Sequence, residues 1–275
     1  MTNDTNRRPG LDQLRLVATD YDGTLLGPER VITPYTRAVL RDLADSHLEL
    51  MVTTGRPPRF CEDMLDELGI PLTLICANGA VAYDPATTTV TQFATLDLDH
   101  THELIDMIRA EHPEAGLCAE LGYDFVAEQR WFEATGRSPV TQVDDLRDHL
   151  DDRVHKLLVS LPDHDAEQAF DRIAPMVGHR ANPTHAGLAF VELMPPGVDK
   201  AFGLERFCAA HGLGPDQVVA FGDMPNDNAM LQWAGWGVAM GNAHHSTKAA
   251  ANEVTASHAE DGVAQVVAEI LAGRS

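Results

Sequence analysis

An apolar run that ends in two closely spaced acids constrains the fold of this chain more than any other feature. Residues 14–19 lead directly into Asp20 and Asp22, and Gly23 follows. Such a run fits a buried strand, and ligands of open α/β sheets bind at the carboxyl ends of the strands. Gly23 allows a sharp backbone turn beyond the acids. The segment predicts a paired-carboxylate site at a sheet edge, with an ordinary surface turn as the alternative.

Strand-like and helix-like segments alternate along the chain, which indicates a parallel sheet with right-handed crossovers. The outer segments predict strands at 14–19, 48–53, 72–76, 218–221 and 237–240, and helices at 34–46, 57–68, 199–211, 226–234 and 263–271. Between them, strands at 88–96, near 117 and 125, at 154–161 and at 188–193 are predicted to mix with helices at 100–112 and 165–177. We therefore expect an α/β core of residues 1–82 and 196–275 and an inserted cap of residues 83–195.

Three further segments carry polar residues where a predicted strand ends or a predicted helix begins. They are Thr54, Gly55 and Arg56 after strand 48–53, Lys200 at the start of helix 199–211, and Asp223, Asn226 and Asp227 after strand 218–221. Because the ends of parallel strands meet at one edge, these side chains are expected to lie near the paired acids.

In sequence order these segments resemble the four motifs of the haloacid dehalogenase (HAD) superfamily of phosphohydrolases. The first family motif, DxDGT followed by an apolar residue, is similar to residues 20–25, and GDxxND is similar to residues 222–227. The long insertion and the turn Asn78-Gly79 are similar to the Cof-type branch, subfamily IIB. The resemblance covers residues from about 14 to 271 and implies a Rossmann-like parallel-sheet core with an α/β cap of the C2 type.

The residue types suit phosphoryl transfer, which needs an in-line nucleophile, neutralised phosphoryl oxygens and a proton for the leaving group. Asp20, at the strand end, is the expected nucleophile and would form an aspartyl-phosphate. Asp22 would protonate the leaving oxygen and then deprotonate the attacking water. The resemblance assigns the same roles, and the dehalogenase and ion-pump branches of the superfamily lack the second acid.

Hard oxygen ligands at this edge favour a magnesium site. Asp20, Asp223 and the main-chain carbonyl of Asp22 are the expected ligands. Asp227 is expected to bind Mg²⁺ directly or to hold a metal-bound water, and the alternative is an acid that stabilises a helix N-terminus.

Several groups are expected to hold the phosphate. The Thr54 hydroxyl, the main-chain N–H of Gly55 and the Lys200 ammonium suit an anion, and Asn226 could donate to a phosphoryl oxygen. Arg56 and Asn78 are also candidates, with ordinary turn roles as the alternative.

The cap sequence singles out no residue for the leaving group. Candidates are Arg130-Trp131-Phe132, His155-Lys156, and Glu192 with Met194 at the end of a returning strand. The aromatic residues could instead pack between helix and sheet.

Charge and composition exclude several classes of partner. The chain has 42 acidic and 20 basic residues, a net charge of −22, which disfavours nucleic acid and anionic membranes. No apolar run reaches the roughly 18 residues of a membrane span. The start of the chain shows no secretory signal. We therefore expect a cytoplasmic protein.

Cysteine and histidine spacing suggests no further metal site. Cys61, Cys76, Cys118 and Cys208 are far apart in sequence. The adjacent His244 and His245 are expected to be solvated rather than metal ligands.

The expected function is Mg²⁺-dependent hydrolysis of a small phosphorylated metabolite. The resemblance implies a sugar phosphate first, with flavin mononucleotide or pyridoxal phosphate as others. A phosphosugar mutase and a non-catalytic sugar-phosphate binding protein are the alternatives. A monomer or small homo-oligomer is expected, and the substrate itself stays open.

Overall fold

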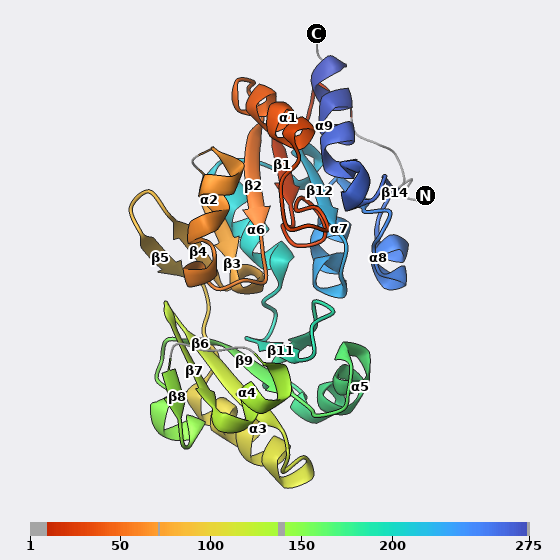
Figure 1. The fold of residues 1–275 in the computed structure, drawn as a ribbon. Coiled ribbons are helices and arrows are strands. Elements are labelled where there is room, and N and C mark those ends of the chain that lie inside the picture. The colour runs from red at the N-terminus through yellow and green to blue at the C-terminus, as the bar shows by residue number, and fades with distance from the viewer. Residues whose placement is uncertain (1–9, 71, 137–140, 274–275) are drawn as a thin grey trace, which may run out of the picture.

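The structure, a computed structural model, describes residues 10–70, 72–136 and 141–273 and contains two sheets (Figure 1). The larger, eight-stranded sheet has the order β14-β13-β12-β1-β2-β3-β4-β5. Its strands are β1 (Leu16–Thr19), β2 (Glu49–Thr53), β3 (Leu74–Cys76), β4 (Val81–Asp84), β5 (Thr89–Gln92), β12 (Val218–Gly222), β13 (Trp236–Ala239) and β14 (Glu253–Val254). From β14 to β3 neighbouring strands are parallel, whereas β4 and β5 add on antiparallel.

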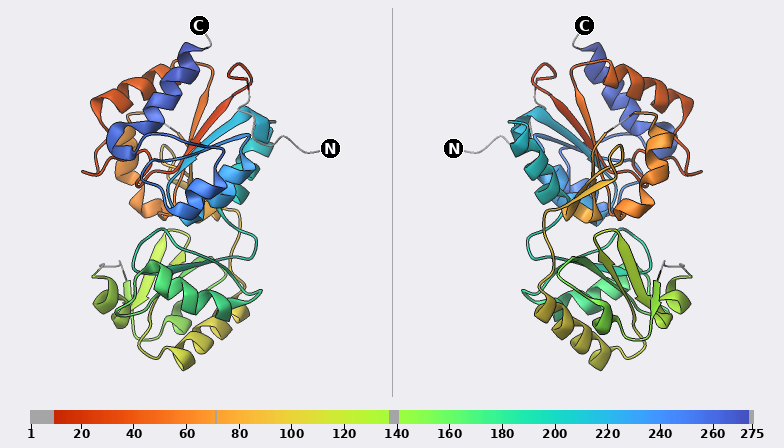
Figure 2. Two further views of the ribbon diagram at one scale, coloured as in Figure 1. Left: turned by 90° about the vertical axis from the view of Figure 1, so that its right-hand side faces the viewer. Right: turned by 90° about the vertical axis from the view of Figure 1, so that its left-hand side faces the viewer.

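Helices cover both faces of this core sheet. They are α1 (Pro34–Ala44), α2 (Glu62–Leu68), α6 (Lys200–Ala210), α7 (Asn228–Trp233), α8 (His245–Ala250) and α9 (Gly262–Ala272), with the short 3₁₀ turns η1 (Pro58–Phe60), η2 (Ala77–Gly79), η4 (Pro215–Gln217), η5 (Pro225–Asp227) and η6 (His258–Glu260). Figure 2 shows α1 and α9 packed together on one face and α6 on the other. All four residues of β1 are buried, as expected of a central parallel strand that is covered on both sides.

The second sheet, of six strands, forms the cap and has the order β10-β11-β9-β6-β7-β8. Its elements are α3 (Leu98–Glu111), β6 (Gly116–Leu121), β7 (Asp124–Glu128), α4 (Gln129–Thr135), β8 (Thr141–Val143), η3 (Leu146–His149), β9 (Val154–Ser160), α5 (Ala166–Val177), β10 (Asn182–Thr184) and β11 (Val191–Met194). The carboxyl ends of the core strands point towards this cap (Figure 1).

Strand periodicity divides the cap sheet into two chemically different faces. Leu117 and Ala119 of β6, Leu157 of β9 and Leu193 of β11 belong to the apolar cluster with α3 and α5. Because successive side chains of a strand point to opposite faces, the residues between them point the other way. That face of β6, β9 and β11 carries the charged residues Glu120, Lys156 and Glu192.

The fold class expected from the sequence is confirmed. The pairing of strands, however, indicates a later entry into the cap than the sequence predicted. The expected crossing at residue 83 falls inside β4, and β5 pairs with β4 in the core sheet. Phe93 and Ala94 still pack on the core cluster, whereas Leu96 belongs to the cap cluster. We therefore propose that the chain enters the cap near Thr95 and returns to the core near Pro195. The expected strand 88–96 is correspondingly only Thr89–Gln92.

The expected helix 57–68 is divided into η1 and α2. Pro57 and Pro58 lack main-chain N–H groups, and the chain turns at Cys61 before the α-helix begins. None of the predicted elements corresponds to β4, β8, β10, β14, α4 or α8, all of which have seven residues or fewer.

Candidate active site

Three neighbouring parallel strands bring the motif residues to one edge of the core sheet. β1 lies between β2 and β12, and Asp20, Thr54 and Asp223 each follow one of these strands. The three side chains are buried, and the Asp20 N–H donates to the Phe221 carbonyl at 2.9 Å. The β-ladder therefore holds the expected nucleophile in register with the neighbouring motif.

Lys200 links two of the acids from the first turn of α6. Its ammonium donates to Oδ1 of Asp20 and to Oδ1 of Asp227, at 2.6 Å in each case, and the side chain is fully buried. Burial alone would lower the pKa of Lys200, but the charges of Asp20 and Asp227 raise it above its ordinary value. The lysine therefore stays charged between the two carboxylates.

Asp227 orients the loop that carries Asp223. Its Oδ2 accepts hydrogen bonds from the main-chain N–H groups of Asp223 and Met224, both at 2.9 Å. The Thr24 hydroxyl donates to Asp223 Oδ1 at 3.0 Å. Gly23 has a positive φ of 77°, and a Cβ there would lie 2.4 Å from Asp223 Oδ2. Only glycine lets the first motif approach the fourth so closely.

The acids form a site that suits a hard cation. Asp20, Asp223 and Asp227 offer carboxylate oxygens within 4.8 Å of one another. Burial raises the pKa of Asp20 well above its ordinary value and that of Asp223 to about 7. A single ammonium faces three carboxylates, so a divalent ion with oxygen ligands fits the excess negative charge. Both Asp227 oxygens already accept hydrogen bonds, which leaves Asp20 and Asp223 as the more accessible donors.

Asp22 stands outside this buried group. Its side chain is 43% exposed, and the carboxylate accepts two hydrogen bonds from the Arg56 guanidinium, at 2.7 and 2.6 Å. Arg30 lies 3.7 Å from the same carboxylate, and the Arg56 guanidinium also stacks over the Tyr21 ring. Arg56, which the sequence assigned to the phosphate, is thus engaged by the expected general acid, because a guanidinium matches a carboxylate in two-pronged geometry.

The remaining phosphate candidates converge around Gly55. The Thr54 hydroxyl is buried and accepts from the Arg56 N–H, and Asn226 Nδ2 donates to Asn78 Oδ1 at 3.0 Å. A Cβ on Gly55 would lie 3.1 Å from that Asn78 oxygen and 3.7 Å from Asn226 Nδ2. Asn226 Oδ1 is buried without a hydrogen-bond partner. An unpaired buried amide oxygen at this position is free to accept from a bound ligand or water.

The cap closes the site with a buried charged cluster. Lys156 Nζ donates to the Gly55 carbonyl at 2.6 Å and to Glu192 Oε1 at 2.8 Å, and lies 3.5 Å from Glu120 Oε2. Burial lowers the pKa of Lys156, and the two glutamates more than offset this, so its pKa is raised. Sequence reasoning offered Lys156 and Glu192 only as candidates and missed Glu120. The sequence signal that could have identified this cluster is one charged residue within each of the otherwise apolar strands β6, β9 and β11.

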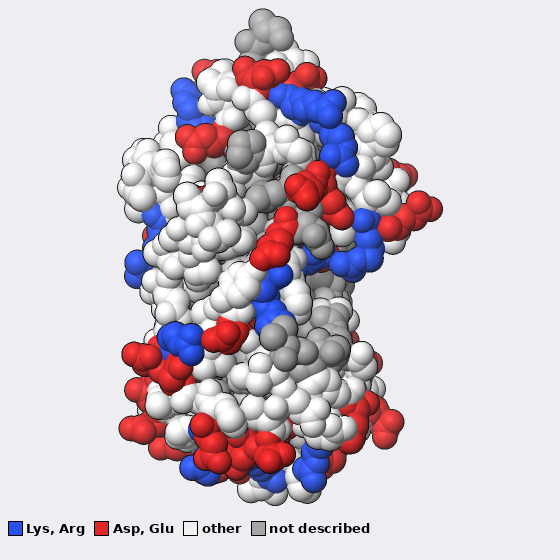
Figure 3. Space-filling view, turned by 60° about the vertical axis from the view of Figure 1, so that its left-hand side comes forward, with Lys and Arg blue, Asp and Glu red and all other residues white. Residues whose placement is uncertain are grey.

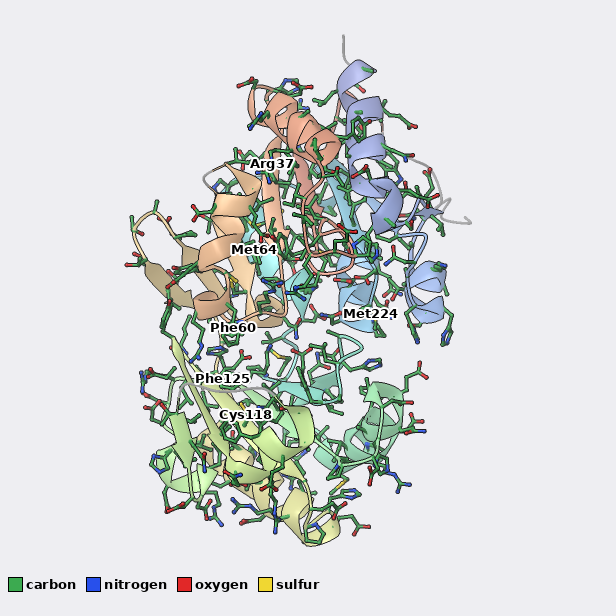
Figure 4. All side chains as sticks on the ribbon, in the orientation of Figure 1. Arg37, Phe60, Met64, Cys118, Phe125 and Met224 are labelled. Atoms are coloured by element: carbon green, nitrogen blue, oxygen red, sulfur yellow. The ribbon has the colours of Figure 1, made fainter. Side chains whose placement is uncertain are left out.

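Among the other cap candidates, Trp131 has a packing role. Trp131 is fully buried, with ring centroids 6.4 Å from Phe125 and 5.2 Å from Phe190. Phe125 in turn meets Phe60 of the core at 6.0 Å, and Figure 4 shows these two rings across the junction. These aromatic contacts place cap and core face to face.

Charge is distributed unevenly over the surface. Figure 3 shows acidic side chains gathered over the far end of the cap, while several basic ones lie near the waist between the two units. Because charges beyond about 8 Å are screened at physiological salt, the net charge of −22 does not by itself decide whether an anionic ligand binds. Within the described residues, none of the helices has the length and apolar character that a membrane crossing requires.

Comparisons with known proteins agree with this geometry. The family model for haloacid dehalogenase-like hydrolases matches residues 17–267. A 5-amino-6-(5-phospho-D-ribitylamino)uracil phosphatase of Bacillus subtilis is 30% identical over 92% of this chain and 96% of its own length. A pyridoxal phosphate phosphatase of Escherichia coli is 28% identical over 92% and 97%.

Solved structures share the two-unit architecture. A haloacid dehalogenase-like hydrolase from Bacteroides thetaiotaomicron superposes with a TM-score of 0.76 at 26% identity, over 94% of this chain and 99% of its own. A subclass IIB sugar phosphatase superposes at 0.78 with 21% identity, over 93% and 98%, which shows a common fold. The chain therefore belongs to the haloacid dehalogenase-like hydrolases and is a phosphatase of that family.

Proposed function

We propose that this phosphatase hydrolyses the phosphomonoester of a small hydroxyl-rich metabolite, a sugar phosphate first, through an aspartyl-phosphate on Asp20 with Mg²⁺ as cofactor. The observation that carries the proposal is the buried Lys200 ammonium between Asp20 and Asp227, with Asp223 beside them. A carboxylate, a fixed cation and a site for a second cation together provide what attack on a phosphate dianion requires.

Asp20 would act as the nucleophile, and Lys200 would hold it in place. The ammonium fixes one carboxylate oxygen at 2.6 Å and supplies positive charge for the phosphoryl group. Mg²⁺, held by Asp20, Asp223 and the main-chain carbonyl of Asp22, would neutralise phosphate charge. Asp227 would act indirectly, because its oxygens are engaged by Lys200 and by the Asp223 N–H.

Asp22 would serve as general acid and then as general base. It is the expected catalytic acid with enough exposure to turn, but the Arg56 guanidinium holds it in the present arrangement. Exchange of Arg56 from Asp22 to a phosphoryl oxygen would free the acid when substrate binds. Both sequence assignments, Asp22 as proton carrier and Arg56 as phosphate contact, are then compatible with the observed pair.

The buried cap cluster supports a hydroxyl-bearing leaving group. Glu192 Oε2 is buried without a hydrogen-bond partner. Glu120 Oε2 and His155 Nε2 are also buried without a full hydrogen bond, and lie 3.5 Å from each other. Leaving a buried polar atom unpaired costs about 1–3 kcal/mol, so such atoms mark positions where a ligand completes the bonding. Carboxylate oxygens accept hydrogen bonds from hydroxyl groups. The Bacillus relative, whose named substrate carries a phosphoribityl group, is consistent with this class.

A panel of phosphorylated metabolites tests the proposal. With Mg²⁺, we expect phosphate release from sugar and sugar-alcohol phosphates with kcat/KM at least about tenfold above that for pyridoxal phosphate. Asp20→Asn serves as the background control. Formation of an isomeric sugar phosphate in the presence of a bisphosphate activator would instead identify a phosphosugar mutase. Binding of sugar phosphates without turnover would identify a non-catalytic binding protein.

A further inference from the structure

A second group of metal-binding side chains spans the junction between cap and core. Among the described residues it is formed by Glu167, His244 and His245, whose ligand atoms lie within 4.8 Å of one another. We propose that this group, the junction site, binds a transition-metal ion of the Zn²⁺ class and thereby fastens the cap to the core. The inference goes beyond the proposed hydrolysis and does not depend on the substrate.

The three side chains come from elements that meet only at the junction. Glu167 lies in the first turn of α5 in the cap, whereas His244 precedes α8 in the core and His245 is its first residue. The distance between Glu167 Oε1 and His244 Nε2 is 2.5 Å, and the two imidazole rings lie 4.1 Å apart. Figure 1 shows α5 and α8 facing each other across the junction. His244 and His245 were expected to be solvated, but the cap covers part of His244.

The donor atoms select a different ion from the catalytic site. Imidazole nitrogen suits Zn²⁺, Ni²⁺ and Cu²⁺, whereas Mg²⁺ prefers oxygen and retains its waters. Two histidines and one carboxylate are a known zinc ligand set, with bonds of about 2.0–2.2 Å and a water in the fourth position. Excess Mg²⁺ can therefore occupy the carboxylates around Asp20 and leave the junction site available.

The surroundings orient His244 for this role. Its Nδ1 accepts a hydrogen bond from the Ser246 main-chain N–H at 3.2 Å and lies 2.8 Å from the Ser246 hydroxyl, which turns Nε2 towards Glu167. A metal bound there would displace the Nε2 proton. Such outer hydrogen bonds fix the ring of a ligating histidine. His185, which is buried, packs edge-on against His244 at 6.2 Å between centroids. It partly shields the site from water.

The junction site is mechanically connected to the motif loop. The main-chain N–H of His244 donates to the Asp223 carbonyl at 2.8 Å. Gly187 of the cap also lies close to this loop: a Cβ built on Gly187 would be 2.6 Å from the methyl carbon of Met224. Figure 4 labels Met224 at the edge of the core that faces the cap. An ion held by Glu167 and the two histidines would resist separation of α5 from this loop. We therefore expect the bound metal to slow cap opening and substrate exchange.

Zinc titration of the full chain, free of any histidine tag and saturated with Mg²⁺, tests the site. By isothermal titration calorimetry we expect one Zn²⁺ to bind with a dissociation constant of about 10 µM or lower, and Glu167→Gln or His245→Ala to weaken binding at least about tenfold. Matched controls are Glu111→Gln and His149→Ala, exposed cap residues of the same types, which should bind as the unaltered protein does.

Hydrogen–deuterium exchange provides a second measurement. Zn²⁺ should slow amide exchange in both α5 and α8 of the unaltered protein and in neither helix of Glu167→Gln. Wild-type binding weaker than about 100 µM, or equal affinity in all variants, would overturn the proposal. In that case the contact between Glu167 and His244 is only a hydrogen bond across the junction. Since no substrate is used, failure here leaves the proposed hydrolysis untouched.

Discussion

The core motif loops and the opposing cap face are both charged and buried, but they differ in how completely their hydrogen bonds are made. In the core, the Lys200 ammonium donates to Asp227 Oδ1, and Asp227 Oδ2 accepts from the main-chain N–H of Asp223. On the cap, Glu192 Oε2 has no hydrogen-bond partner, and Glu120 Oε2 has only His155 Nε2 and Lys156 Nζ, each at 3.5 Å. In the core motif loops, by contrast, only Asn226 Oδ1 is unpartnered among the described residues. A satisfied arrangement is preorganised for one step, whereas an unsatisfied one awaits a ligand.

This difference divides the chemistry between the two units. Charge stabilisation in the core serves any phosphate, because it acts on the group that all substrates share. Recognition of the rest of the molecule falls to the cap, where the leaving group would complete the bonding of Glu120 and Glu192. Substitutions in the core should therefore affect all substrates equally, and substitutions in the cap should not.

The largest effect is expected from Asp20→Asn. The amide keeps the shape of the side chain but is a poor nucleophile, so kcat should fall by at least about 10⁴-fold for every substrate. Steady-state phosphate release, with circular dichroism to verify folding, provides the measurement. Retention of a few per cent of the activity would show that another group attacks the phosphate.

Asp22→Asn should have the next largest effect. Loss of proton transfer should slow turnover by roughly 10²–10⁴-fold. Hydrolysis of the aspartyl-phosphate should slow more than its formation, so acid-quenched samples should accumulate phosphoenzyme. An unchanged rate would mean that Asp22 serves only as a partner for Arg56.

Glu192→Gln should distinguish the role of the cap in substrate selection from the role of the core. We expect kcat/KM for a hydroxyl-rich phosphomonoester to fall about tenfold, while that for a small acyl phosphate changes by less than about threefold. Glu111→Gln, an exposed glutamate on α3, is the control. Equal losses for both substrates would indicate that Glu192 supports the catalytic step and would remove the proposed division of roles.

The smallest effect concerns stability. The folded-state pKa of Asp223 is raised to about 7 from an ordinary 3.8, so folding favours its protonated form. Without metal, this contribution is present below about pH 4 and is lost as pH rises towards 7. Mg²⁺ binds the ionised carboxylate, so its stabilisation should be larger at pH 8 than at pH 6, by a few degrees in Tm. Thermal melts of the wild type and of Asp223→Asn measure this; an equal Mg²⁺ shift at both pH values would exclude Asp223 as a ligand.

Much of the core could be predicted because its signals are local. Apolar runs that end in Asp20, Thr54 and Asp223 mark strands whose ends must meet in a parallel sheet, and the structure brings these residues together with Lys200. The strand predicted at 88–96 was assigned to the cap because β4, which joins it to the core sheet, was not predicted. Only pairing of β4 with β3 places it in the core.

The sequence by itself determined the family, the alternation of strands and helices, and the acids available for phosphoryl transfer, because each depends on residue type and spacing along one segment. Tertiary structure alone decided which polar groups meet. These contacts are Arg56 with Asp22, Lys156 with the Gly55 carbonyl and Glu192, and Glu167 with His244. Each of these contacts joins residues at least 34 positions apart. Their approach depends on sheet register and on how the cap docks, which no local pattern encodes.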